Sequence, residues 1–269
     1  MKSIEITSAE DPRLAPFTAI RERDLAGRDG RFLIEGAVTL EVCLLRGRFP
    51  LESVFLSQQK ADRLAPLLAH HAPDVPVYVA GLNLMSAVAG FPIHRGVLAC
   101  ARKGPELTPA DVFASGNGPT LLCAGLSNHD NVGAVFRNAA GLGARGVLLD
   151  ETTCDPLYRK AIRVSAGTAL WLPFARVGPA DALLEAARTA GQPVWALTPR
   201  HAAPSIWDMP TDPAPALLLG PEGPGLPNAL MDQAQPVRLP MAEEVDSLNV
   251  ATAAAIALAA LNRSSGARR

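Results

Sequence analysis

From Thr120 onward, short apolar runs bounded by glycine or proline alternate with longer segments of helical spacing. The runs "TLLCAGL", "GVLLD", "PVWALT" and "PALLLG" have the length of strands, and the helical segments lie near residues 131–142, 156–168, 180–190 and 247–262. Neighbouring parallel strands need long crossover connections, which helices usually supply. The alternation therefore predicts an α/β fold with a mostly parallel sheet covered by helices on both faces.

The first 103 residues predict a second and smaller α/β domain. The segment "FLIEGAVTLEVCLLRG" has apolar residues at helical spacing, and "SVFLS", "VPVYVA" and "GVLACAR" have the pattern of short strands. Residues 104–119 contain three prolines and three glycines without a sustained period, which is typical of a linker. We therefore predict domains at residues 1–103 and 120–269, joined by a linker at 104–119.

The charges of the chain are nearly balanced. Residues 1–103 hold 13 Lys and Arg against 11 Asp and Glu, and residues 104–269 hold 12 against 15. Since 48% of the 269 residues are hydrophobic, the chain can bury a large core. A polyanionic partner would need a local cluster of cations, because neither part of the chain is strongly basic.

The cysteines and the apolar runs predict a cytoplasmic protein without a metal site or a membrane span. Cys43, Cys100, Cys123 and Cys154 are widely spaced and lie mostly in apolar runs, so we expect buried, reduced thiols. The N-terminus lacks the apolar centre of a signal peptide. The longest apolar run, residues 250–261, has 12 residues, whereas a membrane span needs about 20. We expect this run to form a buried helix.

Two glycine motifs differ in their position relative to the strands. "GLGARG" (141–146) fits G-x-G-x-x-G, but it closes a helix, whereas a dinucleotide fingerprint follows a strand and opens one. Gly143 is therefore predicted as a helix C-cap. "LGPEGPGLP" (219–227) follows a strand directly, and its glycines, Gly220, Gly223 and Gly225, permit positive φ and close approach of a ligand. An ordinary tight connection is the alternative.

The segment "EEVDSLNVATAAA" (243–255) predicts the start of the last helix. Asp246 or Ser247 can cap this helix, whose apolar body would begin at Leu248. Asn249 would then lie buried in the first turn, where an unpaired amide costs about 1–3 kcal/mol. Asn249 therefore needs a partner, in a ligand or in Asn131.

Three segments together resemble the signature of the SpoU/TrmH branch of the SPOUT RNA methyltransferases. They are "NVGAVFRNAAGLG" (131–143), "LLLGPEGPGLP" (217–227) and "LPMAEEVDSLNVATAAAIAL" (239–258), and the likeness covers about residues 120–263. The resemblance implies transfer of a methyl group from S-adenosyl-L-methionine to a ribose 2′-hydroxyl of RNA. It also implies an α/β domain with a deep trefoil knot and a homodimer formed through that domain.

The resemblance carries functional roles to individual residues. Arg137 becomes the catalytic residue, and Asn131, Glu222, Ser247 and Asn249 build the pocket around it. The cofactor is expected to contact Leu219, Gly220, Glu222, Gly223, Leu239, Met241, Ser247, Leu248 and Ala251.

Arg137 has apolar neighbours on its predicted helix, where an arginine should have an anionic partner, although a plain surface arginine is the alternative. The methyl group of a sulfonium is already activated, so the enzyme must chiefly align the attacking oxygen and help it lose a proton. A guanidinium holds its own proton too tightly to be a good free base. Our hypothesis is that Arg137 stabilises the developing alkoxide and holds the adjacent phosphate, while the proton leaves to phosphate or water.

Two clusters of cations are candidate RNA contacts. The first domain loosely resembles the L30e-like substrate-binding domain through Arg23, Arg31, Phe32, Glu35 and Gly36, and of these Arg23 and Arg31 could contact RNA. Arg159, Lys160 and Arg163 form a basic helix face beside an Arg-x-Ser-x-Gly stretch (Arg163, Ser165, Gly167). In both clusters a merely solvated surface is the alternative.

The resemblance favours 23S-type rRNA as the substrate because of the L30e-like domain. Methylation of tRNA is the first alternative. A non-enzymatic RNA-binding or ribosome assembly factor on the same fold is the second, although the presence of Arg137 and Asn249 disfavours it.

Overall fold

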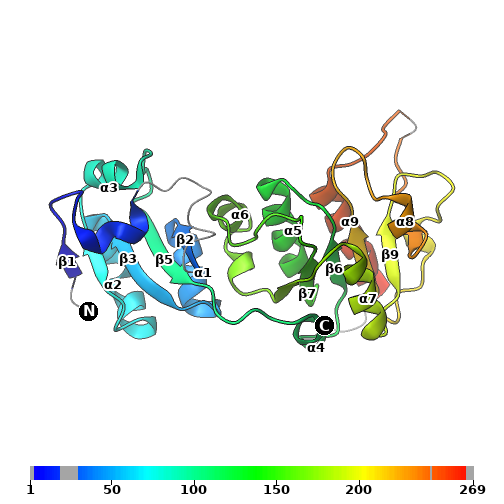
Figure 1. The fold of residues 1–269 in the computed structure, drawn as a ribbon, viewed down its shortest axis with the longest axis horizontal. Helices are drawn as coiled ribbons and strands as arrows, with labels where there is room; N and C mark the ends of the chain where they lie inside the picture. The colour runs from blue at the N-terminus through cyan, green and yellow to red at the C-terminus, as the bar shows by residue number, and fades with distance from the viewer. Residues whose placement is uncertain (1–2, 19–29, 243, 265–269) are drawn as a thin grey trace. The chain divides into compact units, whose positions relative to one another are not determined.

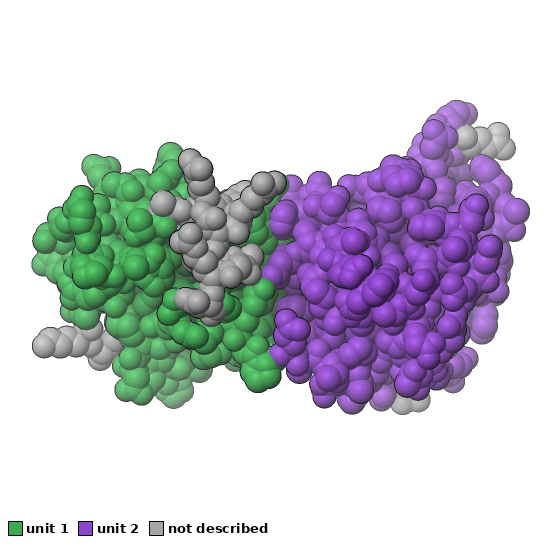
Figure 2. Space-filling view, viewed as in Figure 1, with its two compact units in different colours: residues 1–105, 157–171 green, residues 106–156, 172–269 purple. Residues whose placement is uncertain are grey.

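The computed structural model describes residues 3–18, 30–242 and 244–264 and divides into two compact units. The first unit comprises residues 1–105 and 157–171, and the second comprises residues 106–156 and 172–269 (Figure 2). Residues 157–171 thus belong to the first unit although both flanking segments belong to the second. No helix in the described part of the chain is long and apolar enough to cross a membrane.

The first unit is built on a five-stranded mixed sheet (Figure 1). Its strands lie in the order β1-β4-β3-β5-β2, and β5 runs antiparallel to both of its neighbours. The elements are β1 (Ser3–Glu5), η1 (Pro12–Phe17), β2 (Arg31–Glu35), α1 (Ala37–Arg46), β3 (Leu51–Leu56), α2 (Gln58–His71), β4 (Val77–Val79), α3 (Leu82–Ala89), β5 (Val97–Arg102), α6 (Arg159–Val164) and η2 (Thr168–Leu170). The three strands predicted from sequence near 53–57, 75–80 and 96–102 are confirmed as β3, β4 and β5.

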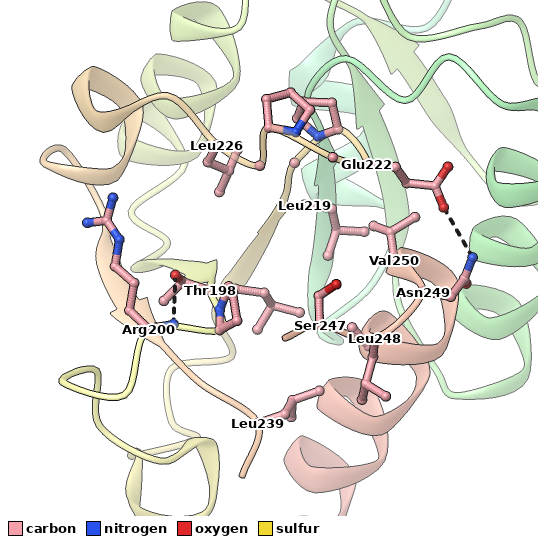
Figure 3. Close-up of a pocket in the computed structure, with 18 of the residues that line it drawn as sticks. Thr198, Arg200, Leu219, Glu222, Leu226, Leu239, Ser247, Leu248, Asn249 and Val250 are labelled. Atoms are coloured by element: carbon pink, nitrogen blue, oxygen red, sulfur yellow. Dashed lines mark hydrogen bonds between the residues drawn. The ribbon is translucent and has the colours of Figure 1, made fainter. Parts of the chain in front are cut away.

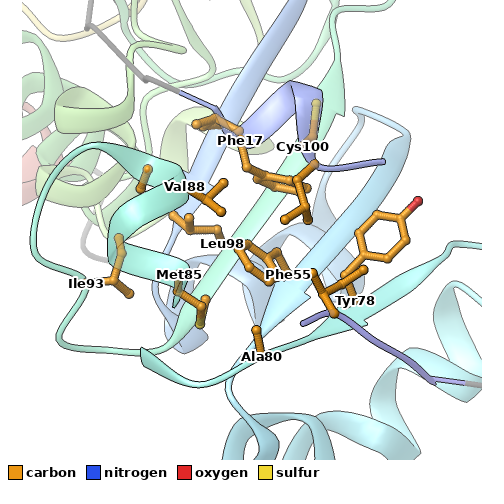
Figure 4. Close-up of a cluster of buried hydrophobic side chains, with 13 residues drawn as sticks. Phe17, Phe55, Tyr78, Ala80, Met85, Val88, Ile93, Leu98 and Cys100 are labelled. Carbon is orange, nitrogen blue, oxygen red and sulfur yellow. The ribbon is translucent and has the colours of Figure 1, made fainter. Parts of the chain in front are cut away.

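One face of this sheet is covered by η1 and α3. Alternate strand residues point to that face and pack with side chains from the two short helices, as the period of two in a strand requires. The cluster includes Phe17, Phe55, Met85, Leu98 and Cys100 (Figure 4). Of the four cysteines expected to be buried, Cys43, Cys100 and Cys123 are buried, whereas Cys154 is only partly buried. Burial raises the pKa of the Cys43 thiol to about 12.

The helical reading of "FLIEGAVTLEVCLLRG" is wrong in its first part. Residues 31–35 form strand β2, and helix α1 begins only at Ala37. Gly36 between them has φ 102°, a conformation that side chains with a Cβ rarely adopt. The glycine therefore separates strand from helix where apolar spacing alone suggested one continuous helix.

The second unit contains a six-stranded sheet in which every neighbouring pair is parallel, as predicted (Figure 1). The strand order is β11-β9-β10-β6-β7-β8. The elements are α4 (Pro109–Ala114), β6 (Thr120–Cys123), α5 (His129–Gly141), β7 (Gly146–Leu149), β8 (Phe174–Arg176), α7 (Asp181–Thr189), β9 (Val194–Leu197), η3 (Ile206–Asp208), β10 (Ala216–Leu219), α8 (Asn228–Met231), β11 (Gln235–Val237) and α9 (Val250–Ser264). Strands β8 and β11 and helix α8 are too short to stand out in the sequence pattern.

Helices cover both faces of this sheet. Side chains of α4, α7 and α8 pack on one face, whereas α5 and α9 pack against each other and against β7 and β10. Ala254, Ala257 and Leu258 of α9 are fully buried, which confirms the expected buried helix. Gly143, with φ 74°, follows α5, and the Ala144 amide donates to the Ala139 carbonyl at 2.9 Å. This is the geometry of a glycine C-cap and confirms that prediction.

The segment expected as a linker, residues 104–119, contains helix α4. Thr108 and Asp111 form a capping box at its start, a signal that the proline and glycine content masked. Since α4 packs on β7 and β8, this part of the segment belongs to the second unit. The domain limits at 103 and 120 stay a prediction.

A buried carboxylate, Asp150, fixes the loops that follow β6 and β7. Its oxygens accept hydrogen bonds from the amide of Gly125 at 3.1 Å, the hydroxyl of Thr152 at 2.7 Å and the amide of Thr153 at 2.8 Å. Burial by itself raises the pKa of Asp150, but these hydrogen bonds outweigh it, so the pKa lies below its ordinary value. Asp150 thereby holds the loop that leads into α5.

We expect Asp150→Asn to lower the free energy of unfolding by about 2 kcal/mol, because an amide places an N–H group against donors. The depressed pKa means that the carboxylate stabilises the fold above about pH 4 and that this contribution is lost as the pH falls through the folded-state pKa. Urea unfolding at neutral and acidic pH measures both effects. The control is Asp232→Asn, which changes an exposed carboxylate and should leave the unfolding free energy unchanged. If the difference in unfolding free energy between wild type and Asp150→Asn does not shrink in acid, the stabilising role of the Asp150 carboxylate is contradicted.

Candidate functional site

A pocket of about 420 Å³ lies where strands β9, β10 and β11 end. Its walls are the segments after these strands together with the start of α9 (Figure 3). In parallel α/β sheets ligands bind at the carboxyl ends of the strands, and small-molecule sites measure about 300–1,000 Å³. Both the position and the size of this pocket therefore fit a small ligand.

The loop after β10 owes its shape to its glycines. Gly223 and Gly225 have φ 88° and 69°, as the sequence predicts. Gly220 does not have a positive φ, which corrects that part of the expectation, but it is needed for space. A Cβ on Gly220 would lie 2.7 Å from Leu226 Cγ and 2.9 Å from the Leu226 amide nitrogen. The loop folds tightly back on itself, so its backbone groups keep fixed directions beside the pocket.

The helix cap predicted at Asp246 or Ser247 is wrong, because α9 begins at Val250 and Asn249 precedes it. The Asn249 Oδ1 atom accepts hydrogen bonds from the amides of Ala251 at 3.0 Å and Thr252 at 3.2 Å, which is the geometry of an N-cap. Asn249 is also exposed rather than buried. The cap therefore lies two or three residues further along the chain than expected, at a residue that also lines the pocket.

The other end of the Asn249 side chain joins two segments of the site. Its Nδ2 atom donates to Asn131 Oδ1 at 2.9 Å and lies 3.3 Å from Glu222 Oε1 (Figure 3 shows the bond to Glu222). The expected partnership with Asn131 is confirmed. Asn131 itself is buried at the start of α5, so the bond to Asn249 gives its buried side-chain oxygen a partner.

Arg137 lies on α5, the helix that this contact ties to the pocket. Its side chain is exposed, and among the described residues it makes no hydrogen bond or ion pair. The next residue, Asn138, donates from Nδ2 to the Ala251 carbonyl at 2.8 Å. Asn131 binds the N-cap residue of α9 and Asn138 binds its first turn, so the part of α5 that carries Arg137 is held against the helix that lines the pocket.

Most of the expected cofactor residues line the pocket. They are Leu219, Gly220, Glu222, Gly223, Leu239, Met241, Ser247 and Leu248, and Asn249, expected as a residue that builds the pocket, lines it as well. Asn131, Arg137 and Ala251 do not line it. The pocket is also lined by three residues after β9 that the sequence patterns do not predict, Thr198, Pro199 and Arg200. The rule that neighbouring parallel strands end at the same edge could have found them, because "PVWALT" was recognised as a strand.

The expected RNA contacts have different surroundings. Arg23 lies outside the described residues. Arg31 pairs with Glu52 at 2.5 Å, and Arg102 also donates to that carboxylate, at 2.6 Å. Arg159 pairs with Glu35 at 2.5 Å, and its guanidinium lies 4.3 Å from the centre of the Phe91 ring. Arg163 is more exposed and stands 3.9 Å from Glu35.

The Arg-x-Ser-x-Gly stretch has a structural role at the end of α6. The buried Ser165 hydroxyl donates to the Ile162 carbonyl at 2.9 Å. Gly167 has φ 83°, and a Cβ there would lie 3.1 Å from the side chain of Val42. The described residues contain no cluster of His, Cys, Asp or Glu that could hold a metal ion.

The fold and the pocket define an α/β protein with a ligand-sized pocket at the ends of a parallel sheet. The SpoU rRNA methylase family model matches residues 119–259. An uncharacterized tRNA/rRNA methyltransferase of Mycobacterium bovis is 37% identical over 268 residues, which cover 97% of this chain and 92% of that protein. The chain belongs to the SpoU rRNA methylase family.

Solved structures extend the likeness to both units. The rRNA methyltransferase of Sinorhizobium meliloti with bound AdoMet has a TM-score of 0.79 at 24% identity, covering 97% of this chain and 98% of the other. An RNA 2′-O ribose methyltransferase has a TM-score of 0.74 at 28% identity with the same coverage. These comparisons establish the α/β fold of the family for the chain, and the trefoil knot stays a prediction.

Asn131→Ala and Asn249→Ala each remove the hydrogen bond between these two side chains. We therefore expect the double variant to lose about 1 kcal/mol less unfolding free energy than the sum of the two single losses. Asn249→Ala alone should cost about 1 kcal/mol more through loss of the cap. Chemical denaturation of the single and double variants measures the coupling. Asn262→Ala, which removes a bond between the same two helices at the Leu142 carbonyl, is the control and should add to Asn249→Ala. Additivity of the first pair would show that the amide bond contributes nothing.

Proposed function

We propose that this protein transfers a methyl group from S-adenosyl-L-methionine to a ribose 2′-hydroxyl of structured RNA. The observation that carries the proposal is the set of contacts made by Asn249. This residue lines the pocket, caps α9 and binds the helix that presents the exposed Arg137. A ligand-sized pocket is thereby coupled to an exposed cation that could meet a polyanionic substrate.

The residues of the pocket fit this cofactor. Leu219, Leu239, Met241 and Leu248 offer apolar contacts for a purine ring, and the stiff loop after β10 offers backbone donors and acceptors. Glu222 contributes a carboxylate, which suits a positively charged ligand. Ser247 adds a hydroxyl. These groups would hold the cofactor, which supplies an activated methyl group when bound.

The reaction then requires an aligned hydroxyl and stabilisation of the charge that develops on its oxygen. Arg137 performs this second task, because a guanidinium donates several hydrogen bonds and can also grip a neighbouring phosphate. The bonds of Asn131 and Asn138 to the start of α9 set the position of Arg137 relative to the pocket. The proton of the hydroxyl leaves to phosphate or water. Asn131 and Asn249 therefore position the catalytic group.

The relatives support ribosomal RNA as the substrate. The 23S rRNA (guanosine-2′-O-)-methyltransferase RlmB of a Burkholderia species is 31% identical over 206 residues, 75% of this chain and 83% of that protein. The M. bovis relative is named for both tRNA and rRNA, so methylation of tRNA is the second candidate. We place the RNA contacts of the first unit at Arg31, Lys160 and Arg163 together with Arg23.

A homodimer through the second unit is part of the proposal. Trp207, Val245 and Leu248 expose between 37% and 46% of their surface in that unit, and large apolar side chains at the surface favour association. Leu248 also lines the pocket, so a partner copy there would complete the wall of the site. Light scattering of the full chain decides between dimer and monomer.

Arg137→Ala should lower methyl transfer by about a hundredfold, because it removes the group that stabilises the developing charge. Transfer of labelled methyl from S-adenosyl-L-methionine is measured with separate rRNA and tRNA pools that lack their own modification. Label recovered as alkali-resistant 2′-O-methyl nucleotide from one pool identifies the substrate class. Arg137→Lys should restore only part of the rate, because an ammonium lacks the planar fork of a guanidinium.

The control for Arg137 is Arg188→Ala, which removes an exposed arginine of the same unit. It should transfer methyl groups at the wild-type rate. Full activity of Arg137→Lys would exclude a requirement for guanidinium geometry. Tight RNA binding without transfer to any pool would favour the assembly factor.

Replacing both Lys160 and Arg163 with alanine should weaken RNA binding. It should also reduce the steepness of the plot of log affinity against log salt concentration by about 1–2, because each lost phosphate contact lowers this slope by about 0.7–0.9. Arg159 stays in place because Glu35 and Phe91 hold it. Filter binding at several salt concentrations measures the slope. Lys60 and Arg63 on α2 of the same unit, replaced together, provide a control with equal charge change. Equal slopes for the two double variants would exclude a specific contact.

A further inference from the structure

Only two charged side chains line the pocket among the described residues, and they have opposite signs. Glu222 belongs to the loop after β10, and Arg200 belongs to the segment after β9. Figure 3 shows them on opposite sides of the pocket. The rest of the lining is apolar or neutral, so these two groups determine how a charged ligand is oriented.

The side of the pocket near Glu222 favours positive charge. The start of α9 lies there, and a helix N-terminus would ordinarily attract an anion. Here the Asn249 side chain already accepts from two amides in the first turn of α9, those of Ala251 and Thr252. Glu222 adds a negative charge beside the same asparagine. A ligand carboxylate on this side would meet the charge of Glu222 without gaining those amides.

The Arg200 side has the opposite character. The Arg200 backbone amide donates to Thr198 Oγ1 at 3.3 Å, and the Nη2 atom donates to Asn228 Oδ1 at 2.6 Å. Asn228 is neutral, and no carboxylate of the described residues pairs with Arg200. A guanidinium has five N–H groups, so most of its donors remain for an anion. The bond to Asn228 holds the side chain at the pocket rim at little cost to its charge.

We propose that Arg200 binds the carboxylate of the amino-acid part of S-adenosyl-L-methionine. This assignment rests on the proposed function, because it presupposes that cofactor. The cofactor carries two positive groups, the sulfonium and the ammonium, and one negative group. Glu222 and Arg200 complement these charges from opposite sides. Arg200 is then a specificity-determining residue that distinguishes the cofactor from analogues lacking the carboxylate.

The test is a thermodynamic cycle measured by titration calorimetry without RNA. Wild type and Arg200→Gln are each titrated with S-adenosyl-L-methionine and with decarboxylated S-adenosylmethionine. Wild type should bind the decarboxylated compound about fivefold to tenfold more weakly. Arg200→Gln should bind S-adenosyl-L-methionine more weakly than wild type by this same factor. Its affinity for the decarboxylated compound should equal that of wild type. Arg200→Lys, which keeps the charge, should restore part of the discrimination.

The matched control is Arg188→Gln. Arg188 also donates to a side-chain amide oxygen, that of Gln233 at 2.9 Å, but it does not line the pocket. The Arg188→Gln variant should bind both compounds with wild-type affinity. Equal weakening of both compounds by Arg200→Gln overturns the proposal. Normal binding of both compounds by Arg200→Gln overturns it too, and weakened RNA retention by the same variant in a separate filter-binding assay would instead assign Arg200 to an RNA phosphate. A wild type that binds neither compound refutes the proposed function itself.

Discussion

The packing of α9 against α5 is the constraint on which the site in the second unit depends. These helices are more than a hundred residues apart in sequence, yet three asparagine bonds join them, from Asn249 to Asn131, from Asn138 to Ala251 and from Asn262 to Leu142. Apolar burial alone would let the alanine-rich α9 slide along α5, because the hydrophobic effect has no direction. The directional amide bonds fix their register. The start of α9, and with it the pocket wall, therefore has one position relative to α5.

Contacts within the chain also hold the loops around the site. The loop after β10 is held by contacts within itself, since Gly220 allows Leu226 to approach its backbone. The loops after β6 and β7 are held by Asp150, a buried acceptor for amides and hydroxyls from both. A preformed site spends little of its binding energy on ordering the protein. Polar residues near the site therefore have two different roles. Glu222 and Asn249 line the pocket, whereas Asp150 stabilises the loops around it.

Helix α6 illustrates that cations on one helix can have different surroundings. Arg159 is mostly buried against Glu35 and Phe91, whereas Lys160 and Arg163 stay the proposed phosphate contacts. The adjacent Ser165 and Gly167 form the helix end and its close packing. Spacing along a helix shows which side chains share a face, whereas the identity of the opposing group depends on distant segments. Glu35 lies 124 positions away from Arg159.

Local patterns in the sequence determined many of the strands and helices, and the resemblance to the family supplied the expected pocket residues. The apolar runs from Thr120 onward identified four of the six parallel strands, the spacing at Gly143 identified a helix C-cap, and the Gly-Pro loop and the segment around Asn249 identified two walls of the site. These features depend on backbone geometry and on burial, which act over a few residues. Tertiary structure decided what depends on distant partners. It moved the cap of α9 to Asn249, because that side chain also binds Asn131, and it brought Arg200 from the β9 edge into the pocket wall. It assigned residues 157–171 to the first unit and engaged Arg159 with Glu35, because the partner of a charged group is set by the folded chain.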